Sequence, residues 1–227
     1  MNRYYSFLIL IYRYHSFLIL IYVSLNTNLS LGGDTISWNE SVSSGQTIIS
    51  SGGNFELGFF RPGDSYPSYY YIGIWYKKLY PQTVVWVANR DKPLDDADGN
   101  LIISQGNLVL FDRLGNRIWS ALETNNISSR NNNNTSVTGV LRDDGNLMLI
   151  DVSISLTLWQ SFDYPTHTLL PGAKLRYDKR TKRKQVLISW KNSNDPGPGL
   201  YSVEIDPENA QFVIKWNRTK EYWASGS

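Results

Sequence analysis

The chain has no cysteine among its 227 residues, so it can form neither a disulfide framework nor a cysteine-ligated zinc site. It has only two histidines, and His167 is the one outside the apolar N-terminal region. With no cysteine and so few histidines, the sequence does not indicate a metal site or a Ser-His-Asp catalytic set. The net charge of +2 is too small to favour nucleic acid as a partner. We therefore expect a non-enzymatic chain without metal or cofactor, held together by packing alone.

Aromatic residues are abundant instead, with 15 Tyr and 8 Trp. Tyrosine and tryptophan are enriched in strands and at binding surfaces. Strong helix formers are sparse, and glycine, serine and asparagine are frequent. This composition predicts an all-β fold.

The first thirty residues differ from the rest because an apolar decapeptide occurs twice, as "RYYSFLILIY" (3–12) and "RYHSFLILIY" (13–22). A basic start, an apolar stretch and small residues near Ser30 and Gly32 predict a signal peptide over 1–32 and hence secretion. The alternative is a retained membrane anchor over 7–25. Arg13 would lie inside that span, where a charge costs roughly 2.5–3.5 kcal/mol.

Secretion predicts N-glycosylation, and Asn-x-Ser/Thr triplets are present. Asn28 would be lost with the signal peptide. The remaining acceptors are Asn39, Asn126, Asn133, Asn134 and Asn217.

Three segments repeat Gly-Asn followed by alternating apolar residues: "GNFELGFF" (53–60), "GNLVLFD" (106–112) and "GNLMLID" (145–151). Alternation of this kind is typical of a half-buried strand. Each segment precedes a tryptophan, which we assign as Trp75, Trp119 and Trp159. One such unit cannot bury its own apolar face, so three should close around a shared aromatic core with pseudo-threefold symmetry.

Together with "YIGIWYKK", "VVWVANRDKPL" and "LWQSFDYPTHTLLPG", these segments resemble the bulb-type lectin domain of plant S-domain receptor-like kinases and S-locus glycoproteins. The resemblance implies a β-prism II fold, with three four-stranded sheets around a pseudo-threefold axis. It places this lectin domain at 33–165 and the beginning of a second lectin-like domain at 166–227.

Members of that family continue into Cys-rich modules, a transmembrane helix and a kinase. This sequence has no kinase-type Gly-rich loop, His-Arg-Asp or Asp-Phe-Gly motif. We expect contact with a membrane only through a retained signal segment or through the C-terminal region that relatives carry.

Mannose-binding members of the wider family carry Gln-x-Asp-x-Asn-x-Val-x-Tyr along one strand, and alternate residues face the sugar. The second repeat has Ile103, Gln105, Asn107, Val109 and Phe111 at these five places. The third repeat has Arg142, Asp144, Asn146, Met148 and Ile150. The first repeat, aligned as Gly53, Phe55, Leu57 and Phe59, keeps none. The candidate carbohydrate contacts are Asp144, Asn146, Arg142, Gln105, Asn107 and Val109. Alternatively, Asn107 and Asn146 only satisfy backbone groups at a turn.

Three functions follow as hypotheses. The first is an extracellular recognition module that binds a protein, a peptide or a co-receptor, with aromatic anchors in "SYPSYYYIGIWY" (65–76). The second is a lectin that binds a mannose-type glycan through the third repeat. The third is an inactive ectodomain fragment in which strand 212–216 has an open edge. The basic run "KLRYDKRTKRK" (174–184) is interpreted as a charged hairpin and not as a nucleic-acid site.

Overall fold

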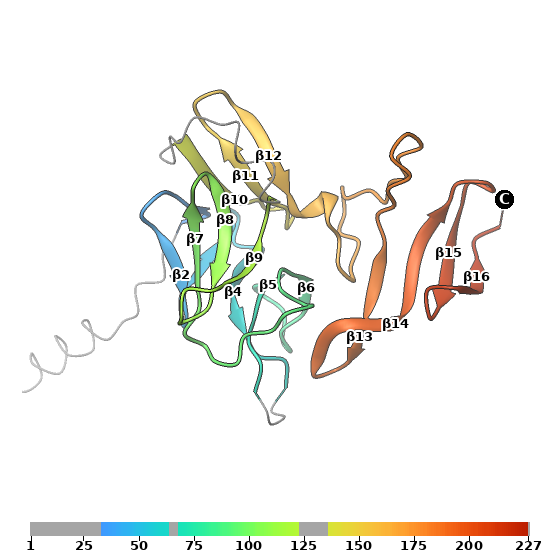
Figure 1. Cartoon of the computed structure of the whole chain (residues 1–227), viewed down its shortest axis with the longest axis horizontal. Coiled ribbons are helices and arrows are strands. Elements are labelled where there is room, and N and C mark those ends of the chain that lie inside the picture. Colours follow the sequence, from blue (N-terminus) through green and yellow to red (C-terminus); the bar gives the residue numbers. More distant parts are fainter. Residues whose placement is uncertain (1–32, 64–67, 123–135, 227) are drawn as a thin grey trace, which may run out of the picture. The chain divides into compact units, whose positions relative to one another are not determined.

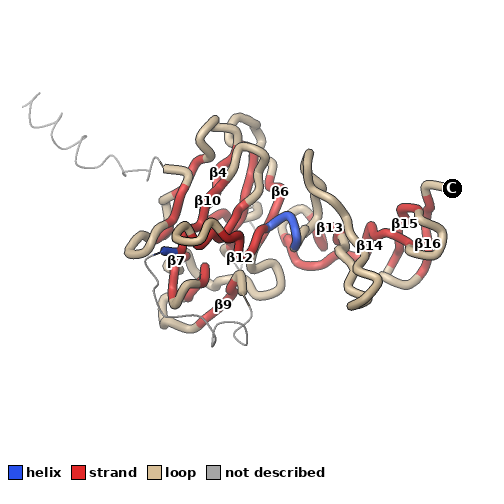
Figure 2. The backbone as a smooth tube through the Cα atoms, turned by 90° about the horizontal axis from the view of Figure 1, so that it is seen from above, coloured by secondary structure: helices blue, strands red, loops and turns tan. Residues whose placement is uncertain are grey.

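Short antiparallel strands make up almost all of the regular structure in a computed structural model of the chain (Figures 1 and 2). The structure describes residues 33–63, 68–122 and 136–226. The predicted signal peptide and the acceptors Asn126, Asn133 and Asn134 lie outside the described residues. The predicted all-β class is confirmed.

Three four-stranded sheets form the N-terminal part of the described chain. The first sheet consists of β3 (Thr47–Ile49), β4 (Phe55–Phe60), β5 (Tyr71–Tyr76) and β6 (Val84–Val87). The second consists of β2 (Ser41–Ser43), β7 (Asn100–Ser104), β8 (Asn107–Phe111) and β9 (Arg117–Ser120). The third consists of β1 (Thr35–Ile36), β10 (Val137–Leu141), β11 (Leu147–Asp151) and β12 (Leu156–Gln160). Because β1 and β2 pair with strands far along the chain, they tie the three sheets together.

The three sheets repeat one strand register. Trp86, Trp119 and Trp159 lie opposite Ile74, Leu110 and Leu149, and a bulge follows at the same place in each sheet. The tryptophan rings meet edge to face, with centroids 5.7 to 5.9 Å apart. This triangle of rings, shared by the three sheets, is the aromatic core of a pseudo-threefold β-prism II.

The alignment of the first repeat with the other two was wrong by one strand. The register makes β5, and not β4, equivalent to β8 and β11. The tryptophan that the first repeat contributes to the central triangle is therefore Trp86, on β6. Trp75 lies on the opposite face of the sheet with Phe60 and Tyr71. Gly-Asn precedes two successive strands, at Gly99 and at Gly106, so the dipeptide alone does not identify which strand follows.

A fourth sheet follows the short 3₁₀ helix η3 (Ser161–Asp163). It contains β13 (Leu187–Asn192), β14 (Asp195–Asp206), β15 (Gln211–Trp216) and β16 (Lys220–Ala224). The expectation of an open edge at 212–216 was wrong, because β15 is paired on both sides, by β14 and β16. Residues 220–224, which we had not assigned as a strand, supply that cover.

Arg90 fastens this fourth sheet to the prism. Its guanidinium is buried and donates five hydrogen bonds of 2.9 to 3.4 Å, all to backbone carbonyl oxygens. The acceptors are Thr166, Ile188, Ser189, Pro196 and Gly197. Burial lowers the pKa of Arg90 from its ordinary value. The five donors of the planar guanidinium are thus all used in holding one backbone arrangement.

Candidate functional site

The outer face of the third sheet carries an open groove of about 350 Å³. It contains the third-repeat candidates Arg142, Asp144, Asn146 and Met148, together with residues at and beyond the end of β12. The latter are Gln160, Phe162, Asp163, Lys174 and Arg176. We call this the third-repeat groove. Only part of the expected strand pattern is a strand, since Arg142 and Asp144 precede β11 and lie in the turn that leads into it.

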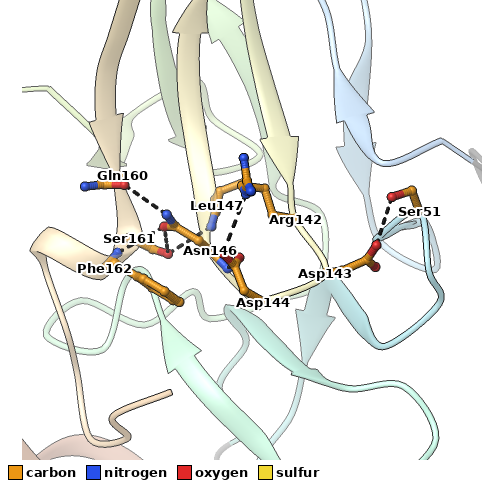
Figure 3. Close-up of polar contacts among 9 residues, drawn as sticks. All are labelled: Ser51, Arg142, Asp143, Asp144, Asn146, Leu147, Gln160, Ser161 and Phe162. Atoms are coloured by element: carbon orange, nitrogen blue, oxygen red, sulfur yellow. Dashed lines mark hydrogen bonds and ion pairs between the residues drawn. The ribbon is translucent and has the colours of Figure 1, made fainter. Parts of the chain in front are cut away.

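The turn before β11 places two neighbouring carboxylates in different surroundings (Figure 3). Asp143 points toward the turn at 50–53, where it accepts hydrogen bonds from the Gly52 amide at 2.6 Å and the Ser51 hydroxyl at 3.0 Å. Asp144 lines the groove and accepts from the amide of Asn146 at 3.0 Å. Gly145, between Asp144 and Asn146, has a φ of +84°, a conformation that glycine adopts without strain.

Asn146 is buried, and its side chain is largely used inside the protein (Figure 3). Its Oδ1 accepts from the Phe162 amide and from the Ser161 hydroxyl, both at 3.2 Å. Its Nδ2 donates to Gln160 Oε1 at 2.9 Å. The side chain therefore joins the start of β11 to the end of β12. One amide hydrogen remains for a ligand.

Two ion pairs line the groove. Arg142 Nε lies 3.6 Å from Asp144 Oδ2, and Arg176 Nη1 lies 3.1 Å from Asp163 Oδ1. Gln160 Nε2 also donates to Asp163 at 2.9 Å. These side chains are partly exposed, so the pairs contribute little to stability and can exchange partners at low cost.

The second repeat does not offer a comparable site. Gln105 is exposed in the turn, but Asn107 and Val109 on β8 are buried, with exposed fractions of 1% and 5%. The Asn107 side chain accepts from the Leu122 amide at 2.9 Å and donates to the Leu122 carbonyl at 3.0 Å. The structure thus separates Gln105 from the other two candidates and uses Asn107 to hold the chain that leaves β9.

The first repeat is filled by aromatic side chains. With the corrected register, Tyr71, Gly73 and Trp75 take the places of Asn146, Met148 and Ile150. Tyr71 and Trp75 are buried against Phe60, and Trp190 of β13 stacks on Phe60 with centroids 6.3 Å apart. The tyrosine-rich stretch therefore contributes these two residues to packing, so they are not available as surface anchors.

Gln160, Asp163 and Arg176 line the groove but were missed by the sequence analysis. They lie outside the five-residue pattern, and Arg176 follows β12 by 16 residues. The available signal was the order of blocks: "LWQSFDYP" places Gln160 and Asp163 directly after the core tryptophan of the third repeat.

Two of the predicted glycosylation acceptors lie within the described residues. Asn39 and Asn217 are exposed in turns and accessible to modification. Within the described ranges, no cluster of three or more His, Asp or Glu side chains could hold a metal ion. No helix in that part of the chain is long and apolar enough to cross a membrane.

Comparison with known proteins relates part of the chain to lectins. Residues 83–191 match the D-mannose binding lectin family. This stretch of the chain is similar to a bulb-type lectin domain. The chain is 50% identical over 200 residues to a G-type lectin S-receptor-like serine/threonine-protein kinase of Arabidopsis thaliana, At2g19130. It is 45% identical over 189 residues to the S-locus-specific glycoprotein S6 of Brassica oleracea.

These alignments cover 85% and 81% of this chain. They cover only 23% of the kinase and 42% of the glycoprotein. Among solved structures, the Japanese Marasmius oreades lectin matches 57% of the chain, with a TM-score of 0.40 and 18% identity.

Proposed function

We propose that this chain is an extracellular recognition module that binds a protein or peptide ligand, a co-receptor included, in the third-repeat groove. The observation that carries the proposal is the charge pattern of the groove. Arg142, Asp144, Asp163 and Arg176 present two exchangeable ion pairs around one opening. A ligand with charged groups can replace either partner of such a pair, whereas a neutral hexose cannot.

A mannose-type glycan is the second candidate for the same groove. Asp144 and one amide hydrogen of Asn146 remain in suitable places. However, Arg142 and Ile150 replace the glutamine and tyrosine of the mannose pattern. Two lost hydrogen bonds at about 0.5–1.5 kcal/mol each would weaken a monosaccharide site by roughly ten- to hundredfold.

Binding by the full chain to a glycan array and to a displayed peptide library tests the proposal. We expect selected peptides to bind, with binding reduced by both Asp144→Ala and Asp163→Asn. Arg113→Gln, which removes an exposed charge from the second sheet, serves as the control. Mannose-selective binding that disappears in Asp144→Ala would establish the lectin alternative and overturn the proposal.

The domain organisation is part of the same proposal: a signal peptide at 1–32, the lectin domain at 33–165 and the start of a second lectin-like domain at 166–227. The chain is proposed to have no enzymatic activity of its own. Secretion predicts glycans on exposed Asn39 and Asn217. Removal of N-glycans from the protein secreted by plant cells should lower its mass, and Asn39→Gln with Asn217→Gln should reduce that difference.

A further inference from the structure

A second groove of about 270 Å³ lies beside the third-repeat groove. The two grooves share Asp163 and Arg176, whose ion pair lies between them. The other side of this second groove is formed by the segment 176–185, which lies outside the five-residue mannose pattern. We call it the hairpin groove.

The hairpin that forms its wall is well ordered by backbone hydrogen bonds. The Asp178 amide donates to the Arg183 carbonyl, and the Gln185 amide donates to the Arg176 carbonyl, both at 2.9 Å. The Asp178 carboxylate caps the turn by accepting from the amides of Arg180 and Thr181. The basic side chains are therefore presented from a defined turn.

Charge is concentrated on this hairpin. The run 174–184 has seven of the chain's 22 Lys and Arg and one of its 20 Asp and Glu, so the remainder is acidic, with 19 against 15. Within the described residues, Lys179, Arg180 and Lys182 are exposed and form no ion pair. A local excess of positive charge on an otherwise acidic chain attracts an anionic ligand to this place in particular.

Arg183 is poised to bind a carboxylate. Its Cζ lies 4.8 Å above the Tyr164 ring, and Tyr164 in turn stacks on Trp159 at 5.6 Å. This contact holds the guanidinium over the ring and leaves its N–H donors available for a bidentate contact with a carboxylate. Arg176, on the same groove, is a second cation.

The groove also has features that suit a peptide. Leu158, Trp159 and Tyr164 supply an apolar surface beside the two arginines. Gln185 Oε1 is buried and accepts no hydrogen bond from the described residues. An unsatisfied acceptor of this kind is costly, and a ligand N–H that reached it would remove that cost. Cations, an apolar surface and an unused acceptor match a carboxylate, an apolar side chain and a backbone amide.

We propose that the hairpin groove binds an acidic peptide segment of a protein partner, with a carboxylate on Arg183 and Arg176 and an apolar neighbour on Tyr164. This inference rests on the proposed function, since it adds a second contact for the same peptide ligand. An acidic polysaccharide would share the charge but has no apolar side chain for the surface formed by Leu158 and Tyr164.

The test is fluorescence anisotropy of the full chain with a labelled peptide of alternating glutamate and leucine. We expect saturable binding that weakens with added salt. Arg183→Gln should weaken it by about tenfold or more, and Arg183→Lys by less, because lysine keeps the charge but not the planar fork. Arg113→Gln removes one charge elsewhere and should leave binding unchanged.

Comparison peptides and Asp144→Ala separate the possible failures. The glutamine-leucine analogue should not bind, and an oligouronate of equal charge should bind more weakly. Equal or tighter binding of the oligouronate, or equal losses in Arg183→Gln and Arg113→Gln, would overturn the inference. Asp144 lines the third-repeat groove but not the hairpin groove. If peptides selected from the library lose binding in Arg183→Gln but not in Asp144→Ala, the hairpin groove stands and the proposed third-repeat site fails.

Discussion

At the scale of single residues, the two asparagines of the repeats are structural first. Asn107 and Asn146 both accept from a backbone amide beyond the last strand of their sheet, from Leu122 and Phe162. The alternative interpretation of the Gly-Asn pairs therefore fits Asn107, which is buried and bonds the backbone of Leu122. Asn146 keeps one donor toward the third-repeat groove, so it can also contact a ligand.

Asn146→Ala should consequently destabilise the fold. It leaves the Phe162 amide and the Ser161 hydroxyl without their acceptor at a buried position, which costs about 1–3 kcal/mol. Urea denaturation of the full chain measures the change. Asn209→Ala removes an exposed asparagine from the fourth sheet and should change the unfolding free energy by less than about 0.5 kcal/mol. Equal stability of Asn146→Ala and the parent would assign Asn146 to ligand binding alone.

His167 makes stability depend on pH. Burial first, and then the charge of Arg90, lower its pKa from 6.5 to about 4, against an opposing hydrogen bond to the Val84 carbonyl. Nε2 lies 2.9 Å from that oxygen, and the ring packs edge-on against Trp190. The unfolded chain takes up a proton on this histidine near pH 6.5, whereas the folded chain does so only near pH 4.

The contribution of His167 is therefore fully present above about pH 6.5 and is lost as the pH falls toward 4. Over that window the unfolding free energy should drop by up to about 3 kcal/mol. Denaturant titration of the parent and of His167→Gln at several pH values gives the difference in their unfolding free energies. That difference separates the contribution of His167 from that of the carboxylates. Parallel curves for the two proteins would show that His167 titrates normally.

At the scale of elements, the tryptophan triangle decides how the three sheets close. Trp86, Trp119 and Trp159 are in mutual contact, whereas Trp75 lies on the other face of the first sheet. Rings so close together should give an exciton couplet in circular dichroism. We expect Trp86→Phe to abolish most of the couplet and Trp75→Phe to keep it.

The two variants are well matched, because each removes a buried indole whose N–H is hydrogen-bonded, to Tyr164 O and to Glu56 respectively. Their stabilities should therefore fall by similar amounts. A couplet that depends on Trp75 instead would restore the original alignment of the repeats.

The sequence was sufficient for the sheet class, the threefold repeat and two of the three central tryptophans. Alternation of apolar residues is a local signal, so it predicts strands without any knowledge of which residues are in contact. The first repeat was aligned wrongly because an insertion lengthens the distance to its tryptophan and because Gly-Asn precedes β4 as well as β8. The distance of 21 residues from Asn54 to Trp75, against 12 and 13 in the other repeats, was the sign of the wrong assignment.

At the scale of the whole molecule, the contacts between prism and fourth sheet could not be read from the sequence. Arg90 binds five backbone carbonyls, and carbonyls are present at every residue. The third-repeat groove was only half predictable for a similar reason. Asp144 and Asn146 follow a family pattern and Asp163 comes shortly after the core tryptophan, but Arg176 reaches the groove from a segment whose path no local signal determines.

Arg90 is therefore the residue whose loss should affect the molecule most widely. Arg90→Met leaves up to five carbonyl oxygens without their donor and should cost about 3 kcal/mol or more. The effect should be uneven: hydrogen exchange should accelerate in β13 and β14, while the tryptophan couplet of the prism persists. Arg90→Lys should be intermediate, since an ammonium group has only three donors. If exchange rises equally in all four sheets, the prism and the fourth sheet form a single cooperative unit. If it rises only in the fourth sheet, the two are separate units that Arg90 helps to hold together.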